Sequence, residues 1–156
     1  MSASVRNRVE VLHGVNFDML GSRDPLHYGG MSLTELEVRI KRFASDVGLE
    51  VAFFQTNHEG EYVEHLHRLP ELADAAILNP GAWTHYSWAI RDALEFSGVP
   101  AVEIHLSDVS KREEFRKLSV FDGLELRIGR VYGKGPDGYR EALEMIADHL
   151  RAKADG

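Results

Sequence analysis

The sequence predicts an α/β domain built on an open, mainly parallel sheet, and three observations lead to this prediction. Five short apolar segments with strand character alternate with segments that have the apolar spacing of a helix. Glycine, proline or asparagine marks most boundaries between them. The length suits a single domain over residues 1–156, with a substantial core. Right-handed connections would place helices on both faces of such a sheet.

The first half of the chain contains two of the predicted strands. Residues 9–12 (VEVL) form the first, and a glycine-rich loop follows it. A helix is predicted after Ser32, because Glu35 three residues later completes a capping box. Its apolar residues keep helical spacing until Gly48 ends it: Leu33, Leu36, Ile40, Phe43 and Val47. Residues 49–55 (LEVAFFQ) form the second strand.

The middle of the chain continues this alternation. A helix is predicted over residues 62–69 and stops near Pro70. Residues 75–79 (AAILN) form a short buried strand. A helix over residues 85–96 follows, and glycine and proline separate it from a fourth strand over residues 100–106.

The C-terminal part adds the fifth strand and the last helix. The charged segment KREEFRK covers residues 111–117 and has the pattern of a solvated helix face. Residues 124–128 (LELRI) are the predicted fifth strand, and a helix is predicted over residues 137–150. We expect residues 1–7 and 151–156 to be flexible tails.

The composition excludes several classes of protein. A formal net charge of −7 argues against a general nucleic-acid or anionic-membrane binder, because both need a basic face. The absence of cysteine excludes disulfides, thiolate nucleophiles and cysteine zinc sites. The first residues have no apolar signal core, and no apolar run approaches the roughly 20 residues of a membrane span. We expect a cytoplasmic, soluble protein with no membrane or nucleic-acid partner.

Polar loops follow four of the predicted strands. The carboxyl ends of parallel strands lie at one edge of the sheet, where ligands bind in folds of this class. Asparagine, histidine and arginine are frequent in these loops. The residues expected at this edge are His13, Asn16, Arg23, Tyr28, Asn57, His58, Glu59, Asn79, His85, His105, Ser107, Arg112 and Arg116.

Two groups at this edge suit proton transfer. Arg23 lies five residues before Tyr28 in the loop GSRDPLHYGG. Tyrosine has an ordinary pKa of about 10, and a nearby cation favours its phenolate. We therefore expect Arg23 to make Tyr28 acidic enough to act as a base, with His105 as the complementary acid. The same residues also fit an Arg–Tyr packing contact and a structural histidine.

Other motifs favour structural roles. GKGPDG (133–138) matches a dinucleotide-binding pattern, but it opens the last helix and lacks a following strand and a distal acidic residue. A receiver domain would have a phospho-accepting aspartate at the position of Asn79, so the asparagine argues against that role. Asn79 also fits a simple turn. Arg112 and Arg116 fit a salt-bridged helix face as well as an anion site.

The histidines give little support for a metal site. His65 and His67 are two residues apart on a predicted helix and therefore point in different directions. His58, His85 and His105 could converge, but the sequence lacks an H-x-x-x-H pair. We expect no metal.

Five motifs, taken in order, resemble type II 3-dehydroquinate dehydratase. They are HGVNFDMLGSRDPLHYGG, QTNHEGE, LNPGAWTHYSWAIRDAL, VEIHLSDVSKREEFR and GKGPDGYREAL. The resemblance covers nearly the whole chain and implies a flavodoxin-like three-layer sandwich with a five-stranded parallel sheet. It implies a homododecamer, a tetramer of trimers, that converts 3-dehydroquinate to 3-dehydroshikimate without metal or cofactor.

The resemblance also implies catalytic roles. Tyr28 would remove a proton alpha to the ketone, and Arg23 would keep it ionised. Asn16 would hold a water that stabilises the enolate. His105 would protonate the leaving C1 hydroxyl, and Glu103 would support His105 from behind.

Substrate-binding roles follow from the same resemblance. Asn79, Ser107 and the backbone of Leu106 would hold the carboxylate and the C1 hydroxyl. His85 and Arg116 would hold the ring hydroxyls.

Two further residues would act beyond the pocket itself. Asp92 would reach a neighbouring subunit's site. Arg112 would belong with Arg23 to a mobile lid whose closure excludes water.

The chain departs from the family pattern at several positions. His13-Gly14-Val15-Asn16 stands where Asn-Gly-Pro-Asn is usual, and Leu118-Ser119-Val120 stands where His-Ser-Tyr is usual. The other departures are Asp108 in place of asparagine, and the bulk of Trp83 and Trp88. These changes leave open a paralogue that acts on a related hydroaromatic acid, or a non-catalytic binder of small carboxylates. A metal hydrolase is a more distant alternative, and a biosynthetic role and a catabolic role fit equally.

Overall fold

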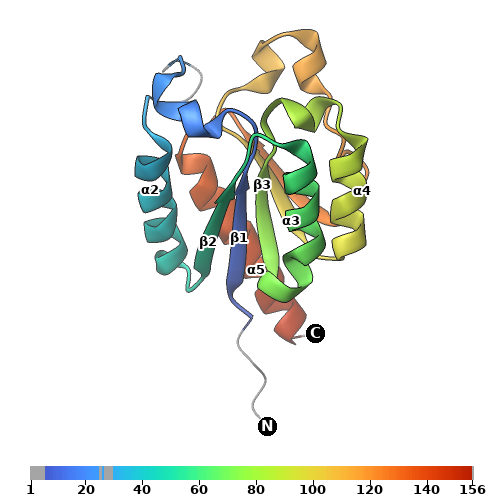
Figure 1. Cartoon of the computed structure of the whole chain (residues 1–156). Coiled ribbons are helices and arrows are strands. Elements are labelled where there is room, and N and C mark those ends of the chain that lie inside the picture. Colours follow the sequence, from blue (N-terminus) through green and yellow to red (C-terminus); the bar gives the residue numbers. More distant parts are fainter. Residues whose placement is uncertain (1–5, 25, 27–29, 156) are drawn as a thin grey trace.

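A five-stranded sheet runs through the centre of the computed structural model, which describes residues 6–24, 26 and 30–155. All neighbouring strands are parallel, in the order β2-β1-β3-β4-β5 (Figure 1). The strands are β1 (Arg8–His13), β2 (Glu50–Gln55), β3 (Ala75–Asn79), β4 (Ala101–His105) and β5 (Arg127–Tyr132). The predicted parallel sheet is confirmed. This order reverses direction between β1 and β3, and ligands bind at such a switch point in open sheets.

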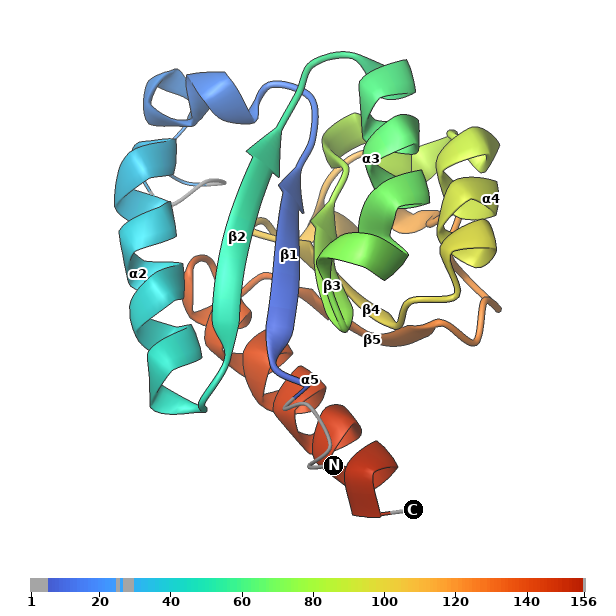
Figure 2. The same ribbon diagram turned by 60° about the horizontal axis from the view of Figure 1, so that its bottom comes forward.

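Helices cover both faces of the sheet. They are α2 (Leu33–Asp46), α3 (Glu59–Leu72), α4 (Trp88–Ser97) and α5 (Asp137–Asp155). Helices α2 and α5 lie on one face, and α3 and α4 lie on the other (Figures 1 and 2). The expected flavodoxin-like three-layer sandwich is therefore confirmed. Within the described residues, no helix is long and apolar enough to cross a membrane.

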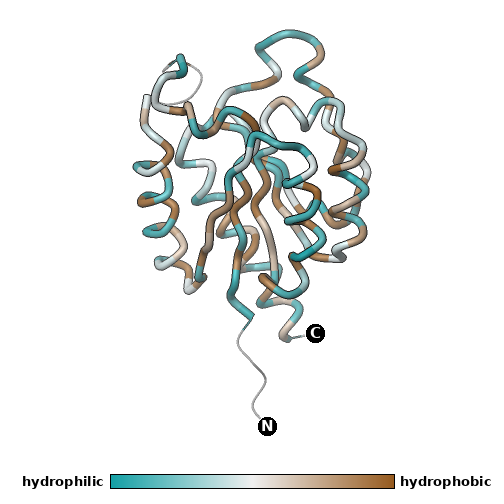
Figure 3. The backbone as a smooth tube through the Cα atoms, in the orientation of Figure 1, coloured by the Kyte–Doolittle hydropathy of each residue, from teal (hydrophilic) through white to brown (hydrophobic). Residues whose placement is uncertain are grey.

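The apolar strands separate two cores. Along β1, Val11 faces α2 and α5 while Leu12 faces α3 and α4, because successive side chains of a strand point to opposite faces. Both residues are at most 1% exposed. The apolar colour of the sheet in Figure 3 reflects its burial on both faces. Burying each such side chain contributes roughly 1.5–3 kcal/mol.

The predicted cap of α2 is present. The Ser32 hydroxyl accepts a hydrogen bond from the Glu35 backbone N–H at 3.1 Å and donates one to the Glu35 carboxylate at 3.1 Å. The capped helix packs Leu36 and Ile40 into the first core, both 0% exposed. The local signal and the packing agree here, which is why this helix was predictable.

Helices α3 and α4 differ from their predicted bounds. Helix α3 continues past Pro70, because a proline in the last turn removes one amide donor and the Ala73 N–H still reaches the Leu69 carbonyl at 2.9 Å. The segment predicted as one helix over residues 85–96 is a 3₁₀ helix, Gly81–His85, followed by α4. Ser87 separates them by accepting a hydrogen bond from the Ile90 N–H.

The predicted fifth strand is wrong in position. Residues 121–127 form tight turns, with Leu124 N–H donating to Phe121 and Arg127 N–H donating to Leu124, both at 3.0 Å. The strand is instead Arg127–Tyr132, which pairs with β4. The first three residues of LELRI lie in the turns and only the last two lie in β5, and the strand itself contains two arginines and a glycine, which concealed it.

The remaining differences concern the charged segment and the chain end. The segment 111–117 forms parts of two short 3₁₀ helices, Val109–Lys111 and Glu114–Lys117. Helix α5 extends to Asp155, so residues 151–155, predicted to be a tail, are helical. A 3₁₀ helix, Phe17–Ser22, lies in the loop after β1.

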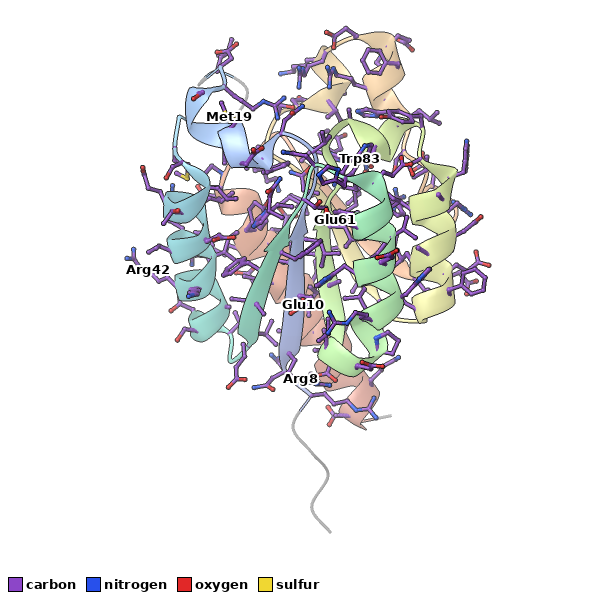
Figure 4. All side chains as sticks on the ribbon, viewed as in Figure 1. Arg8, Glu10, Met19, Arg42, Glu61 and Trp83 are labelled. Carbon is purple, nitrogen blue, oxygen red and sulfur yellow. The ribbon has the colours of Figure 1, made fainter. Side chains whose placement is uncertain are left out.

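The loops after β1 and β3 approach each other closely at the carboxyl edge. Gly14 N–H donates to the Asn79 carbonyl at 2.8 Å, and a Cβ on Gly14 would lie 2.4 Å from the Pro80 backbone. A side chain at position 14 would therefore push the two loops apart. Figure 4 shows Trp83 in the upper part of the molecule near this edge, whereas Arg8 lies at the opposite end of the sheet.

We expect Gly14→Ala to lower the free energy of unfolding by about 1–3 kcal/mol, because the backbone of Pro80 must move to accommodate the methyl group. Urea unfolding followed by circular dichroism would measure the change. Gly60→Ala is the matched control, since a Cβ there meets no atom within 4 Å. Equal stability of Gly14→Ala and the unmodified protein would contradict the close approach.

Candidate active site

A pocket opens at the carboxyl edge of the sheet, beyond the ends of β1, β3 and β4. Four segments line it, those that follow β1, β3 and β4 and the 3₁₀ helix Glu114–Lys117. The lining residues are Val15, Asn16, Phe17, Arg23, Asn79, Gly81, Ala82, His85, His105, Leu106, Ser107, Val109, Arg112 and Arg116. The pocket therefore lies at the switch point of the sheet, where the strand order predicts a ligand site.

The structure brings together most of the residues that the sequence predicts for the site. Those in the lining are Asn16, Arg23, Asn79, His85, His105, Leu106, Ser107, Arg112 and Arg116. Glu103 lies directly beneath the pocket, in contact with His105. Asp92 is exposed on α4, outside the lining of this pocket. Tyr28 lies outside the described residues.

His105 is held by a buried carboxylate. Its Nε2 lies 2.6 Å from Oε2 of Glu103, and the two side chains are 6% and 1% exposed. Because the Nε2–H group donates a hydrogen bond to the carboxylate, Nδ1 is the nitrogen that can act on a ligand. A carboxylate in this position orients the ring and stabilises its protonated form.

Glu103 has several partners besides His105. Oε2 also accepts from the Thr84 hydroxyl at 2.7 Å, while Oε1 accepts from the Ser119 hydroxyl at 2.7 Å and from Arg127 at 3.0 Å. Burial opposes the charge of this carboxyl, but hydrogen bonds from His105, Thr84 and Ser119 lower its pKa from 4.5 to about 2. Glu103 is therefore ionised at neutral pH.

His85 presents a second imidazole to the pocket. Its Nδ1–H donates to the Leu118 carbonyl at 2.7 Å, and its ring lies 6.3 Å from that of His105 in a stacked arrangement. Burial lowers the pKa of His85, and the nearby His105 and Arg116 lower it further. The hydrogen bond to the Leu118 carbonyl acts in the opposite direction. His85 therefore favours the neutral form, with Nε2 available as an acceptor for a hydroxyl group.

Asn16 adopts a left-handed backbone conformation, with φ of 72°. Its backbone N–H donates to the Asn57 side-chain oxygen at 2.8 Å, and that oxygen also accepts from Gln55 at 3.2 Å. Asparagine tolerates this conformation better than most residues. The loop after β2 thus fixes the position of Asn16 at the pocket.

The pocket favours an anionic ligand although the protein is acidic. Arg23, Arg112 and Arg116 line it, and among the described residues none that lines it is acidic. Arg112 donates to the Ser107 hydroxyl at 3.3 Å. Arg116 pairs with Glu113 and lies over the Phe115 ring at 4.8 Å. Guanidinium groups of this kind suit carboxylate recognition.

The two unusual residues near Asn16 have different positions. His13 is 0% exposed and faces α2, where its Nε2 lies 3.1 Å from the Glu37 carboxylate. Its ring stacks between Phe17 and Phe53 at centroid distances of 5.6 and 5.9 Å. Val15, in contrast, lines the pocket. The titratable ring is thus part of the core, and the substitution that faces a ligand is the valine.

The remaining departures leave the pocket lining unchanged. Leu118 offers only its carbonyl to His85, and its side chain is half exposed, while Val120 is fully buried. Trp83 is buried against Tyr62, and Trp88 is exposed on α4. Asp108 accepts a hydrogen bond from the Ser110 N–H at 3.1 Å and caps a 3₁₀ helix.

The glycine-rich motif GKGPDG supports the site from outside. Gly133 N–H donates to the Ser107 carbonyl at 3.0 Å, and Gly135 N–H donates to the Leu106 carbonyl at 3.1 Å. The motif therefore fixes the segment after β4, in agreement with the predicted turn. Over the residues described here, no group of three or more histidine, aspartate or glutamate side chains is arranged to hold a metal ion.

Three partners of Glu103 could not be recognised from the sequence. Thr84, Ser119 and Arg127 lie 19, 16 and 24 residues from it. A single threonine, serine or arginine carries no sequence pattern of its own. Only their shared contact with a buried charge marks them, and that contact requires the fold.

The low pKa of Glu103 predicts acid sensitivity. The folded pKa of about 2 lies below the ordinary 4.5, so ionised Glu103 stabilises the fold fully above pH 4.5, and this contribution disappears as pH falls toward 2. The contribution is on the order of 3 kcal/mol. We expect Glu103→Gln to be less stable at pH 7 and to lose less stability between pH 5 and pH 2.5. Urea unfolding across this range would measure how the free energy of unfolding changes with pH in the unmodified protein and in Glu103→Gln. Parallel changes in the two proteins would contradict the low pKa of Glu103.

Known proteins resemble this chain over nearly its whole length. The family model described as Dehydroquinase class II matches residues 7–147. The 3-dehydroquinate dehydratase of Syntrophotalea carbinolica is 48% identical over 147 residues, which cover 94% of this chain and 98% of that protein. The enzyme of the same name from Pelobacter propionicus is 44% identical, with 93% and 97% covered. The crystal structure of type II dehydroquinase from Propionibacterium acnes superposes with a TM-score of 0.83 at 34% identity, with 94% and 99% covered. The chain belongs to the class II dehydroquinase family.

Proposed function

We propose that this protein is a hydro-lyase that converts 3-dehydroquinate to 3-dehydroshikimate. One observation carries the proposal: a histidine on a buried carboxylate faces a pocket lined by three arginines. Relatives that align over 94% and 93% of this chain are named 3-dehydroquinate dehydratase. An acid group and a cationic pocket are what the dehydration of a hydroxylated carboxylic acid requires.

The elimination begins at Tyr28. Tyr28, ionised beside Arg23, takes a proton from the carbon alpha to the ketone, and the electron pair of that C–H bond forms an enolate. A water held by Asn16 stabilises the negative charge on the enolate oxygen. Arg23 lies in the pocket lining, which places the positive charge at this edge of the sheet. The step needs no oxidant, metal or cofactor.

His105 completes the reaction. The enolate collapses to a conjugated enone as the bond between C1 and its hydroxyl oxygen breaks, and His105 donates the proton with which that oxygen leaves as water. Its Nε2 contact with Glu103 leaves Nδ1 for this transfer. The carboxylate of Glu103 stabilises the imidazolium that must exist before the transfer.

Binding uses the other residues of the pocket. Asn79, Ser107 and the Leu106 backbone hold the carboxylate and the C1 hydroxyl. His85 and Arg116 hold the ring hydroxyls, and the neutral His85 expected from its lowered pKa suits this role. Arg23 and Arg112 close over the bound substrate and exclude water.

The assembly and its setting follow from the same family. Twelve chains form a tetramer of trimers in the cytoplasm, and Asp92, exposed on α4, reaches the site of a neighbouring subunit. The reaction serves either the biosynthetic shikimate pathway or quinate catabolism, since both use the same chemistry.

Purified protein mixed with 3-dehydroquinate should show rising ultraviolet absorbance from the conjugated enone. Treatment with EDTA should leave the rate unchanged. Tyr28→Phe and His105→Asn should each lower kcat by about 10²–10⁴, because each removes a proton-transfer group. Turnover that depends on added metal would favour a hydrolase instead.

An inactive wild-type protein would decide between the remaining alternatives. A rise in melting temperature with a substrate analogue, without turnover, would indicate a binder of small carboxylates. Turnover of another hydroxylated cyclic acid would indicate a paralogue with altered specificity, for which Val15 in the pocket lining is the first residue to exchange.

The shared site can be tested by complementation. Asp92→Ala chains keep His105, and His105→Asn chains keep Asp92, so co-expressed chains should regain part of the activity that each lacks alone. His105→Asn co-expressed with Tyr28→Phe is the control, because both groups belong to the same chain's site. Light scattering should give about 210 kDa for twelve chains of 17.5 kDa. No recovery in the first mixture would contradict a shared site.

A further inference from the structure

Two arginines of the edge strand β5 approach the carboxylate that holds His105. Arg127 reaches Oε1 of Glu103 at 3.0 Å, and Nε of Arg130 lies 3.7 Å from the same oxygen. His105 occupies the other oxygen, Oε2, at 2.6 Å. The carboxylate is thus shared between the histidine on one side and two cations on the other.

The register of the sheet creates this arrangement. Glu103 pairs with Arg130 across β4 and β5, and His105 pairs with Tyr132. Paired residues of neighbouring strands point to the same face, so Arg130 is aimed at Glu103 from the edge of the sheet. An irregularity between Ala101 and Val102 shifts the pairing and allows Arg127 to approach as well.

The two arginines differ in how their charge is compensated. Arg127 also pairs with Asp122 at 2.7 Å, so a carboxylate other than that of Glu103 neutralises part of its charge. Nε and one terminal nitrogen of Arg130 are buried and have no hydrogen-bond partner among the described residues. Arg130 therefore acts on Glu103 mainly as a charge.

The other groups around this pair come from several separate segments of the chain. Thr84 and Ser119 donate to Glu103 and carry no charge, and the buried Tyr62 of α3 lies within electrostatic range of it. His85, Arg112 and Arg116 face His105 from the pocket. The cations on the ligand side belong to the site already described, whereas Arg127 and Arg130 lie behind the carboxylate.

We propose that Arg127 and Arg130 are positioning residues that reduce the stabilisation of the His105 imidazolium by Glu103, so that the imidazolium releases its Nδ1 proton more readily. The proposal rests on the proposed function of His105 as the acid. A carboxylate paired only with the histidine would favour the charged ring strongly, and such a ring would be a poor donor. Sharing the carboxylate with two cations reduces this effect, and the cations also repel the imidazolium directly. Both effects act in the same direction.

The test is the pH dependence of kcat in four variants. Arg127→Met and Arg130→Met should each move the alkaline limb to higher pH by roughly 0.5–1 unit, because the protonated ring persists further. Arg127→Lys keeps the positive charge and should keep the profile of the unmodified enzyme. Arg91→Met is the matched control: Arg91 holds the same segment through the carbonyls of Val120 and Asp122 at 2.6 and 2.8 Å, without touching Glu103. A purely structural role would lower stability in Arg91→Met and Arg127→Met alike and leave both profiles unmoved.

A second readout separates this proposal from the proposed function. Nuclear magnetic resonance of ring-labelled histidine follows the protonation of His105 directly, with His105→Asn to assign its signal. The pH midpoint of His105 protonation should rise in Arg127→Met and Arg130→Met whether or not 3-dehydroquinate is turned over. An unmoved midpoint in both variants would overturn the inference. Inactivity of the unmodified protein with a moved midpoint would count against the proposed substrate alone.

Discussion

The structure depends most on the ionised carboxylate of Glu103, which is 1% exposed in the centre of β4. A buried charge is tolerated only when hydrogen bonds and opposite charges compensate it. Its partners come from separate parts of the chain: the 3₁₀ helix after β3, the loop before β5, β5 itself and His105. The need to compensate one charge therefore joins these segments and, in doing so, orients the histidine of the pocket. Stability and the geometry of the site have the same cause.

The close approach of the loops after β1 and β3 supplies the other wall of the pocket. Gly14 and Gly81 allow it, since a Cβ on either would lie within about 3 Å of the opposing backbone. Asn79 stabilises the contact, with its side chain accepting from the Gly81 N–H at 3.2 Å and its carbonyl from Gly14. Side chains from two non-consecutive strands thereby meet at the switch point. The pocket is a direct consequence of the strand order.

Much of this could be predicted because the signals are local. The cap at Ser32, the apolar spacing of α2 and the buried run of β3 each lie within one short segment. The rule that strands end at one edge then gathers Asn16, Asn79 and His105 without any long-range information. The prediction of β5 failed because its arginines look unlike a buried strand, and their contacts with Glu103 depend on the fold. Tertiary compensation of a charge leaves no periodic trace in the sequence.

The position of His13 shows how a departure near a site can be neutral for its chemistry. A histidine two residues from the pocket loop suggests a new titratable group at the ligand, yet its ring is enclosed by Phe17 and Phe53 and contacts Glu37 of α2. It therefore ties the end of β1 to the neighbouring helix α2. The change that a ligand would meet is Val15, which alters shape and leaves the charge of the pocket as it was. Specificity should respond to the valine, and rigidity of the loop should respond to the histidine.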